Sequence, residues 1–255
     1  MKAAFQCLCI LMSFPIAASA DWVTGIGVNF SDVRYNALAP NDTAGVPGYQ
    51  QDHWNNTDQQ TPAATFLDNH GAATTLGVNI GLASSFTQGT AAGPDELLFD
   101  GTLLSAPFLP ATVSLTGIPY ARYDVLVYVG NRSLAVNAKP FYVNVAGQLA
   151  YGTVPRQSTP GFVDGDLDTP FTYVEAGYDE GSAVLISNFA LFKNLTASHL
   201  EIKVGSTDVL GSGPTISALQ IIAVPEPSSI VLASAGAILG IAVAWQRTRA
   251  DGLAS

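Results

Sequence analysis

The feature that most limits the fold is an alternation of apolar and polar residues that recurs through the middle of the chain. In residues 122–129, the side chains of Tyr123, Val125, Val127 and Val129 fall on one face. Because side chains along a strand point to opposite faces in turn, this pattern predicts a β-strand near the centre of a sheet. Similar runs, separated by Gly, Pro, Asn and Asp, are 23–30, 73–80, 111–116, 141–145, 148–154, 171–175, 183–187, 199–204 and 216–222.

One segment has a helical pattern instead. Residues 94–104 begin with a proline and two acidic residues, and they place leucines at 97, 98, 103 and 104. Gly101 limits this helix to a short element. Many short strands and one short helix predict an all-β fold, an antiparallel β-sandwich of jelly-roll type. Residues 36–68 carry little strand pattern, so we expect a long loop packed over the sandwich, where functional residues tend to lie.

Residues 1–20 have the three-part layout of a secretory signal peptide. Lys2 is followed by a long apolar run, and small residues at 18–20 precede Asp21. A buried N-terminal helix is the alternative, but Pro15 would break it. We therefore expect cleavage by signal peptidase and a mature chain that starts near Asp21.

Residues 228–245 form the second apolar end of the chain. These 18 residues carry no charge, and as a helix they would span roughly 27 Å, close to the hydrocarbon thickness of a bilayer. Arg247 and Arg249 follow, which favours a cytoplasmic tail and leaves residues 21–227 outside. The segment is predicted to be a transmembrane helix; a core helix is the alternative, since Ala, Gly and Ser are frequent in it.

Pro225-Glu226-Pro227, the apolar span and the Arg-containing tail together resemble the PEP-CTERM sorting signal of Gram-negative bacteria that make extracellular polysaccharide. The resemblance covers residues 225–255. It implies that an exosortase-type membrane protease acts near the motif. It also implies an exported protein, held at the inner membrane before processing and then found at the outer surface or in the extracellular matrix. The tail is longer than in the family, because residues 250–255 follow the last Arg.

Residues 21–224 are long enough for one β-sandwich ectodomain with a sizeable core. They contain 7 of the 10 basic and 18 of the 20 acidic residues, which gives a formal charge of about −11. So acidic a surface argues against nucleic acid as a partner, because phosphate binding needs clustered Lys and Arg. Both cysteines, Cys7 and Cys9, lie in the predicted signal peptide. The mature chain therefore has no disulfide and no thiolate metal site.

A second resemblance covers the ectodomain. It rests on residues 27–30, 38–47, 53–56 and 216–222, which resemble an exported module that recurs in PEP-CTERM proteins of planctomycete-type bacteria. This resemblance implies a β-sandwich, often likened to galactose-binding-like domains, and it implies no established activity.

An acidic cluster in the second half of the ectodomain suggests calcium as a cofactor. Asp164, Asp166, Asp168 and Glu175 stand at positions 1, 3, 5 and 12 of a segment, the spacing of oxygen ligands in a calcium loop. Thr169 stands where such a loop needs glycine, and the flanking segments are predicted strands. A solvated acidic turn is therefore the alternative.

Five residues in the long loop form a candidate sugar site. An aromatic ring can stack on the C–H face of a sugar while amides and carboxylates bind its hydroxyls. The alternative is that the tryptophan fills one end of the sandwich and the asparagines bind loop backbone. The candidate residues are Tyr49, Asp52, Trp54, Asn55 and Asn56.

The sequence favours a non-catalytic role. It has no Gly-x-Ser-x-Gly turn, and its three histidines lack metal-type spacing. We therefore predict a binding or structural module for exopolysaccharide, without enzyme activity. A secreted hydrolase acting on polysaccharide is the alternative, since two of the many carboxylates would be enough for glycoside hydrolysis.

Overall fold

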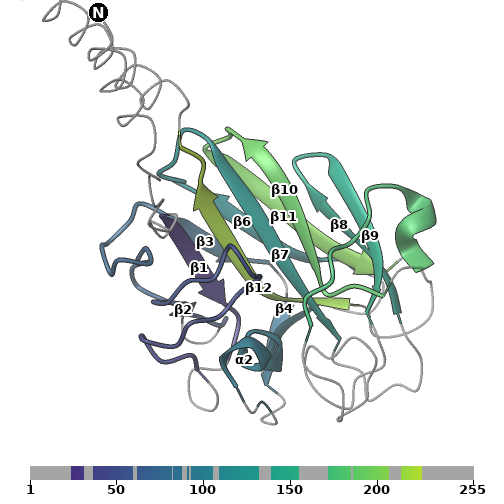
Figure 1. Cartoon of the computed structure of the whole chain (residues 1–255), viewed down its shortest axis with the longest axis horizontal. Helices are drawn as coiled ribbons and strands as arrows, with labels where there is room; N and C mark the ends of the chain where they lie inside the picture. Colours follow the sequence, from purple (N-terminus) through teal and green to yellow (C-terminus); the bar gives the residue numbers. More distant parts are fainter. Residues whose placement is uncertain are drawn as a thin grey trace, which may run out of the picture.

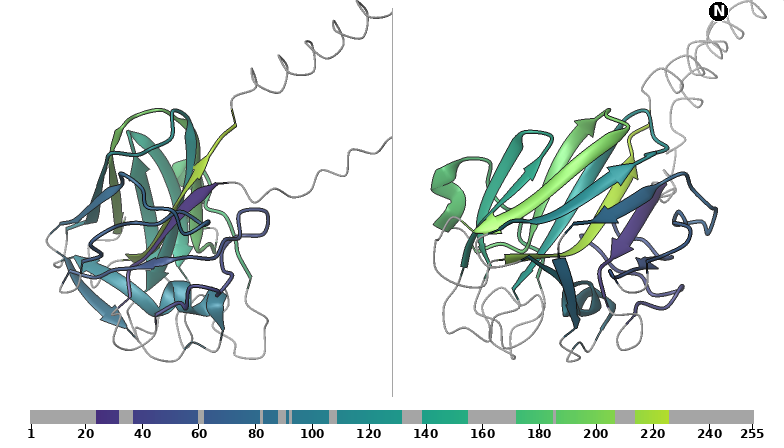
Figure 2. Two further views of the ribbon diagram at one scale, coloured as in Figure 1. Left: turned by 90° about the vertical axis from the view of Figure 1, so that its left-hand side faces the viewer. Right: turned by 180° about the vertical axis from the view of Figure 1, so that it is seen from behind.

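Two β-sheets pack face to face (Figures 1 and 2). In the computed structural model, the described residues are 24–31, 37–59, 62–81, 83–87, 91, 93–105, 109–131, 139–154, 172–184, 186–206 and 214–225. The predicted signal peptide 1–20, the predicted transmembrane span 228–245, the motif residues Glu226 and Pro227 and the acidic residues Asp164, Asp166 and Asp168 lie outside these ranges. Within them, no helix is long and apolar enough to cross a membrane.

The first sheet has seven strands. Its main path runs β10-β7-β12-β1-β2, with β5 also paired to β12 and β4 paired to β5. All of these pairs are antiparallel except the short parallel pair between β1 and β2. The strands are β1 (Gly25–Asn29), β2 (Asn55–Asn56), β4 (Ala83–Thr87), β5 (Gly101–Ser105), β7 (Tyr123–Asn131), β10 (Phe189–Leu195) and β12 (Pro214–Ala223).

The second sheet has five strands in the order β3-β6-β11-β8-β9, all antiparallel. They are β3 (Gly77–Ile80), β6 (Ala111–Thr116), β8 (Lys139–Val145), β9 (Gln148–Val154) and β11 (His199–Ser206). One α-helix, α2 (Pro94–Asp100), and one 3-10 helix, η1 (Glu180–Val184), complete the described elements. The prediction of an antiparallel β-sandwich with one short helix is thus confirmed.

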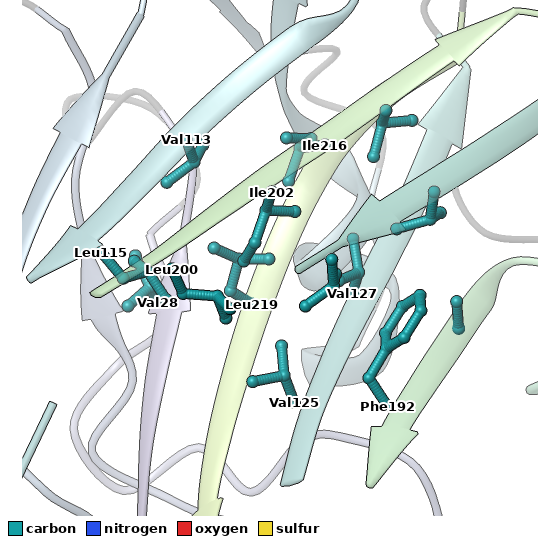
Figure 3. Packing of buried hydrophobic residues seen from close by; sticks show 14 of the residues in the cluster. Val28, Val113, Leu115, Val125, Val127, Phe192, Leu200, Ile202, Ile216 and Leu219 are labelled. Atoms are coloured by element: carbon teal, nitrogen blue, oxygen red, sulfur yellow. The ribbon is translucent and has the colours of Figure 1, made fainter. Parts of the chain in front are cut away.

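The main core lies between the two sheets. Val113, Leu115, Leu200 and Ile202 of the five-stranded sheet interdigitate with residues such as Leu219 of the seven-stranded sheet (Figure 3). In a close-packed protein core, burial of each methylene group contributes about 0.8 kcal/mol to the free energy of folding.

A second apolar layer covers the outer face of the seven-stranded sheet. On β7, Val125 and Val127 face the main core, whereas Leu126 and Tyr128 belong to this second layer. The predicted apolar face of β7 is therefore confirmed, but its other face is buried as well. The cover is made by α2, by the loop residues 37–59 and by the segment around Tyr173.

Two predicted strands are wrong. Residues 172–174 form no regular element, and Ala183 lies in η1. In residues 172–174, the Asn188 side chain supplies part of the hydrogen bonding that a neighbouring strand would give. Its Oδ1 accepts from Val174 N and its Nδ2 donates to Thr172 O, both at 2.9 Å, beside a backbone bond from Asn188 N to Val174 O. Glu175 and Ile186 make only isolated bridges, to Phe189 and Thr153.

The predicted helix 94–104 is too long. It ends at Asp100, because Gly101 leaves the helical region with φ −90° and ψ 142° and begins β5. Leu103 then pairs with Ile216 of the central strand β12. Tertiary pairing here overrides a local helical pattern.

The strand β10 carried no alternation in the sequence. Phe189 and Leu191 face the outer layer, whereas Ala190 and Phe192 face the main core. A strand buried on both faces reads as a continuous apolar run, which periodicity alone does not distinguish from a buried helix.

We predict that Gly27→Ala destabilises the protein. A Cβ atom at Gly27 would lie 2.5 Å from Cε3 of Trp54, so the indole ring would have to move out of the outer layer. The expected loss is about 1–3 kcal/mol of unfolding free energy, measured by urea denaturation. The control is Gly181→Ala, where the new atom would meet only the exposed Asp179 carboxylate, at 3.2 Å. Equal stability of both variants would contradict the packing described here.

Candidate functional site

A pocket of about 340 Å³ opens on the outer side of the seven-stranded sheet, where three covering segments meet. We call it the α2 pocket. Its lining residues come from the loop 45–50, the first turn of α2, the segment before Glu175 and the start of β10. They are Gly45, Val46, Pro47, Gln50, Asp95, Thr172, Tyr173 and Phe189.

Aromatic rings form the floor of the α2 pocket. Tyr173, which is partly exposed, lies 6.0 Å from Tyr128 and 6.2 Å from Phe189 between ring centroids, in edge-to-face contacts. Phe99 and Trp54 extend this cluster beneath Tyr128, at 5.8 and 6.0 Å. Edge-to-face pairs at such distances are favourable, so the position of the Tyr173 ring is well fixed.

A carboxylate stands beside the Tyr173 ring. Oδ1 of Asp95 accepts a hydrogen bond from Gly45 N at 2.9 Å and another from the Tyr173 hydroxyl at 2.7 Å. Gly45 has φ 121°, a conformation that favours glycine, and this presents its N–H to Asp95. The Asp95 carboxylate therefore joins the loop, the helix and the Tyr173 segment.

Buried hydrogen bonds hold the loop of the pocket from below. The Tyr128 hydroxyl donates to Gln220 Oε1 at 2.8 Å and accepts from Val46 N at 3.3 Å. Gln220 Nε2 in turn donates to Gln51 Oε1 at 2.9 Å and to the carbonyl of Tyr49. The ends of the loop are closed by paired backbone bonds between residues 44 and 51. The loop is thus preorganised, which lowers the entropy lost on binding a ligand.

The remaining polar groups of the pocket are accessible. Gln50 and Thr172 are exposed, and Asp95 is half-buried. The described lining of the pocket therefore combines the rings of Tyr173 and Phe189 with the Asp95 carboxylate, the Gln50 amide and the Thr172 hydroxyl in a small concave surface.

The candidate sugar residues predicted from the sequence lie beside this pocket and do not line it. Trp54 is only 4% exposed, and its Nε1 donates to Gln51 O at 3.0 Å. Its ring sits over Gly27 inside the outer layer, so it offers no surface for stacking. Tyr49 is half-buried against the same layer, and Oδ1 of Asp52 lies 3.1 Å from Nδ1 of His53.

Asn55 and Asn56 bind loop backbone, as in the structural alternative. Asn55 Nδ2 donates to Gly27 O and to Leu67 O, both at 2.8 Å, and its Oδ1 accepts from Leu67 N at 2.8 Å. Asn56 makes the equivalent pair of bonds with Leu38, at 3.0 and 2.8 Å. Both side-chain amides therefore act as fixed parts of the fold.

The calcium hypothesis stays a prediction. Of its four candidate ligands, the structure describes only Glu175, which is exposed and accepts a hydrogen bond from the Tyr178 hydroxyl. Among the described residues, no group of three or more His, Cys, Asp or Glu side chains could hold a metal ion.

Two other surfaces were candidates. A smaller hollow of about 210 Å³ lies beside β3 and is lined by Asp58 and by the apolar residues Phe66 and Val78 among others. On the outer face of the five-stranded sheet, the half-buried Tyr142 ring covers Gly205. An aromatic ring over a strand glycine is a common packing device in sheets. The hollow beside β3 does contain an aromatic ring and a carboxylate, but Phe66 is 5% and Asp58 0% exposed, whereas Tyr173 and Asp95 of the α2 pocket are both partly exposed.

Sequence reasoning missed Gln50, Asp95, Thr172 and Tyr173. The separations are large: Asp95 is 50 residues from Gly45 and 78 residues from Tyr173. No local spacing connects them, and only the covering of the seven-stranded sheet brings them together.

The structure predicts abnormal titration of the tyrosines. Burial raises the pKa of Tyr120 to about 12, and it is also the main cause of the raised pKa of Tyr123, Tyr128, Tyr173 and Tyr178. Above about pH 10 the unfolded chain therefore releases protons that the folded chain keeps, so stability falls as pH rises.

Absorbance at 295 nm should show these five tyrosines ionising above pH 10, together with loss of the circular dichroism of the folded protein. In urea, all nine tyrosines of the chain should titrate near pH 10. Titration of all nine near pH 10 in the folded protein would contradict the burial described.

The chain has weak similarity to solved structures. The YXIM protein of Bacillus subtilis is 12% identical over 78% of this chain, with a TM-score of 0.39, and this chain spans 40% of its length. A family 35 carbohydrate-binding module from Clostridium thermocellum is 12% identical over 58% of this chain and 92% of its own, with a TM-score of 0.31. The CBM35 of Cellvibrio japonicus Abf62 is 9% identical over 57% and 84%, with a TM-score of 0.30. No protein-family model and no curated protein sequence matches the chain.

Proposed function

We propose that this chain is an exported surface or matrix protein whose β-sandwich, of the jelly-roll and galactose-binding-like kind, binds polysaccharide through the α2 pocket without catalysing a reaction. The observation that carries the proposal is the set of side chains in that pocket. The Tyr173 ring lies next to the carboxylate of Asp95, with Gln50 and Thr172 on the same rim.

This set matches the chemistry of a sugar ring. The C–H face of a sugar packs on an aromatic ring, and its hydroxyls bond to carboxylates, amides and hydroxyls. A pocket of about 340 Å³ has room for one or two sugar residues of a longer chain. Because its loop and ring are held by buried bonds, little order has to be gained on binding.

The same residues favour binding over hydrolysis. Glycoside hydrolysis needs two carboxyl groups on either side of the scissile bond. Asp95 is the one carboxylate among the described residues that line the pocket, and its Oδ1 is engaged by two donors. A hydrolase would have to use groups outside this pocket.

The two ends of the described sandwich lie side by side. Gly25 of β1 pairs with Ile222 of β12, and Ala223 N donates to Thr24 O at 2.9 Å, so the described chain enters and leaves at adjacent points. These points lie on the side of the sandwich away from α2 (Figures 1 and 2). A membrane-held precursor would therefore expose the α2 pocket on the far side.

Arg122 holds Val224 and Pro225, the first residue of the motif Pro225-Glu226-Pro227. Its Nη2 donates to Pro225 O at 3.1 Å, and its carbonyl accepts from Val224 N at 2.9 Å. The proposed sorting signal thus begins at a fixed exit from the sandwich. We propose that signal peptidase acts at the N-terminal end of the chain and that an exosortase-type protease acts near the motif.

The binding proposal predicts that two substitutions weaken affinity for polysaccharide. The full chain, in mild detergent, is screened against immobilised bacterial and plant polysaccharides. Gln50→Ala should lower affinity about five- to tenfold, because one hydrogen bond of roughly 1 kcal/mol is lost. Tyr173→Leu should lower it at least as much, because the stacking surface is removed.

The control for the first change is Gln148→Ala, an exposed glutamine at the start of β9. Melting temperatures of all variants show whether each is folded. Absence of binding to every polysaccharide, or equal affinity in wild type and both pocket variants, would refute the proposal.

A separate prediction concerns calcium. If Asp164, Asp166 and Asp168 bind the ion with Glu175, millimolar calcium should raise the melting temperature of the wild-type chain, because a ligand that binds only the folded state stabilises it. Asp166→Ala should abolish this shift. An unchanged melting temperature in calcium, or the same shift in the variant, would remove calcium from the proposal.

A further inference from the structure

The described lining of the α2 pocket carries a negative charge and no positive charge. Among the described residues that line the pocket, Asp95 is the only acidic side chain and none is Lys, Arg or His. The carboxylate is half-buried, so its field acts in a partly desolvated space where Coulomb interactions are less screened than in water.

The neighbouring phenol responds to this negative charge. Burial is the main cause of the raised pKa of Tyr173, followed by the effects of Tyr128 and of the Asp95 carboxylate. The Tyr173 hydroxyl therefore keeps its proton and donates a hydrogen bond to Oδ1 of Asp95 at 2.7 Å. Tyr173 therefore presents a fixed, uncharged ring against which a ligand can pack.

The rest of the ectodomain does not compensate for this charge. Residues 21–224 have a formal charge of about −11. An anionic ligand is thus repelled over the long range by the whole domain and at short range by Asp95, whereas a neutral ligand meets neither cost.

We infer that the α2 pocket takes an uncharged sugar residue, and that Asp95 excludes residues with a carboxylate, such as uronic acids. This inference rests on the proposed function and specifies its ligand class. Asp95 then has two roles: it accepts the bonds that hold Gly45 and Tyr173, and it sets the charge that the ligand must have.

The test uses a matched pair of polymers that differ in charge. The polysaccharide that binds best in the screen is the starting material. If it is neutral, oxidation of its primary alcohols to carboxylates gives the charged counterpart. If it is acidic, reduction of its carboxyl groups gives the uncharged counterpart. Affinities are measured with the full chain in EDTA, which prevents bridging of carboxylates by divalent ions. Salt is kept at about 20 mM, where screening is weak.

The uncharged member of the pair should bind at least tenfold more tightly. Asp95→Asn keeps the size and the Oδ1 acceptor but removes the charge, and it should reduce this ratio to about threefold or less. The control is Asp179→Asn: this exposed carboxylate also accepts one backbone N–H and one hydroxyl, both from Ser182, and does not line the pocket. It should leave the ratio unchanged.

The outcomes separate the two proposals. If the charged polymer binds as well as or better than the uncharged one, the charge inference is wrong while polysaccharide binding stands. If the ratio is the same in wild type and Asp95→Asn, selection by Asp95 is likewise refuted. If no polysaccharide binds at all, the proposed function fails and this inference fails with it.

Discussion

The structure depends on the burial of its central strands on both faces. β7 and β12 contribute side chains to the core between the sheets and also to the layer under α2. A β-sandwich normally leaves the outer face of each sheet polar. Here Leu126, Tyr128 and Ala218 make that face apolar, so it requires a cover. The cover is built from α2 and from irregular chain, and the α2 pocket lies where parts of this cover meet.

Irregular chain over a sheet creates a second requirement, because its backbone groups have no ladder partners. Buried N–H and C=O groups without partners cost free energy comparable to a lost hydrogen bond. Side-chain amides meet this need: Asn55 binds Leu67, Asn56 binds Leu38, and Asn188 binds Thr172 and Val174. Gln220, on β12 itself, does the same for Tyr49. The polar residues of this layer therefore act mainly as structure, and few of them remain available to a ligand.

This explains which parts could be predicted from the sequence. The sequence pattern identified β6, β8 and β11, whose outward-facing residues are mostly polar. It also identified β7 and β12, although both faces of these strands are buried. It failed for β10, where Phe189 to Phe192 form a continuous apolar run without alternation, and for residues 172–174, where the Asn188 side chain binds Val174 N and Thr172 O. The segment around Trp54 has the residue types of a sugar site, but Trp54 is buried in the cover of the sheet. Residue types alone do not distinguish an aromatic ring that packs in the interior from one that binds a ligand.

The residues of the α2 pocket were beyond sequence reasoning for a related reason. Asp95 looked like an ordinary acidic residue in a first helical turn, and Tyr173 like a strand residue. Each has a separate local explanation, so neither stands out. Their juxtaposition follows from the doubly buried sheet: Tyr128 fixes the loop at Val46, the loop presents Gly45 N to Asp95, and Asp95 receives the Tyr173 hydroxyl. Asp95 does not touch β7 in this chain of contacts, yet its position beside Tyr173 is set by the packing of the outer layer on β7.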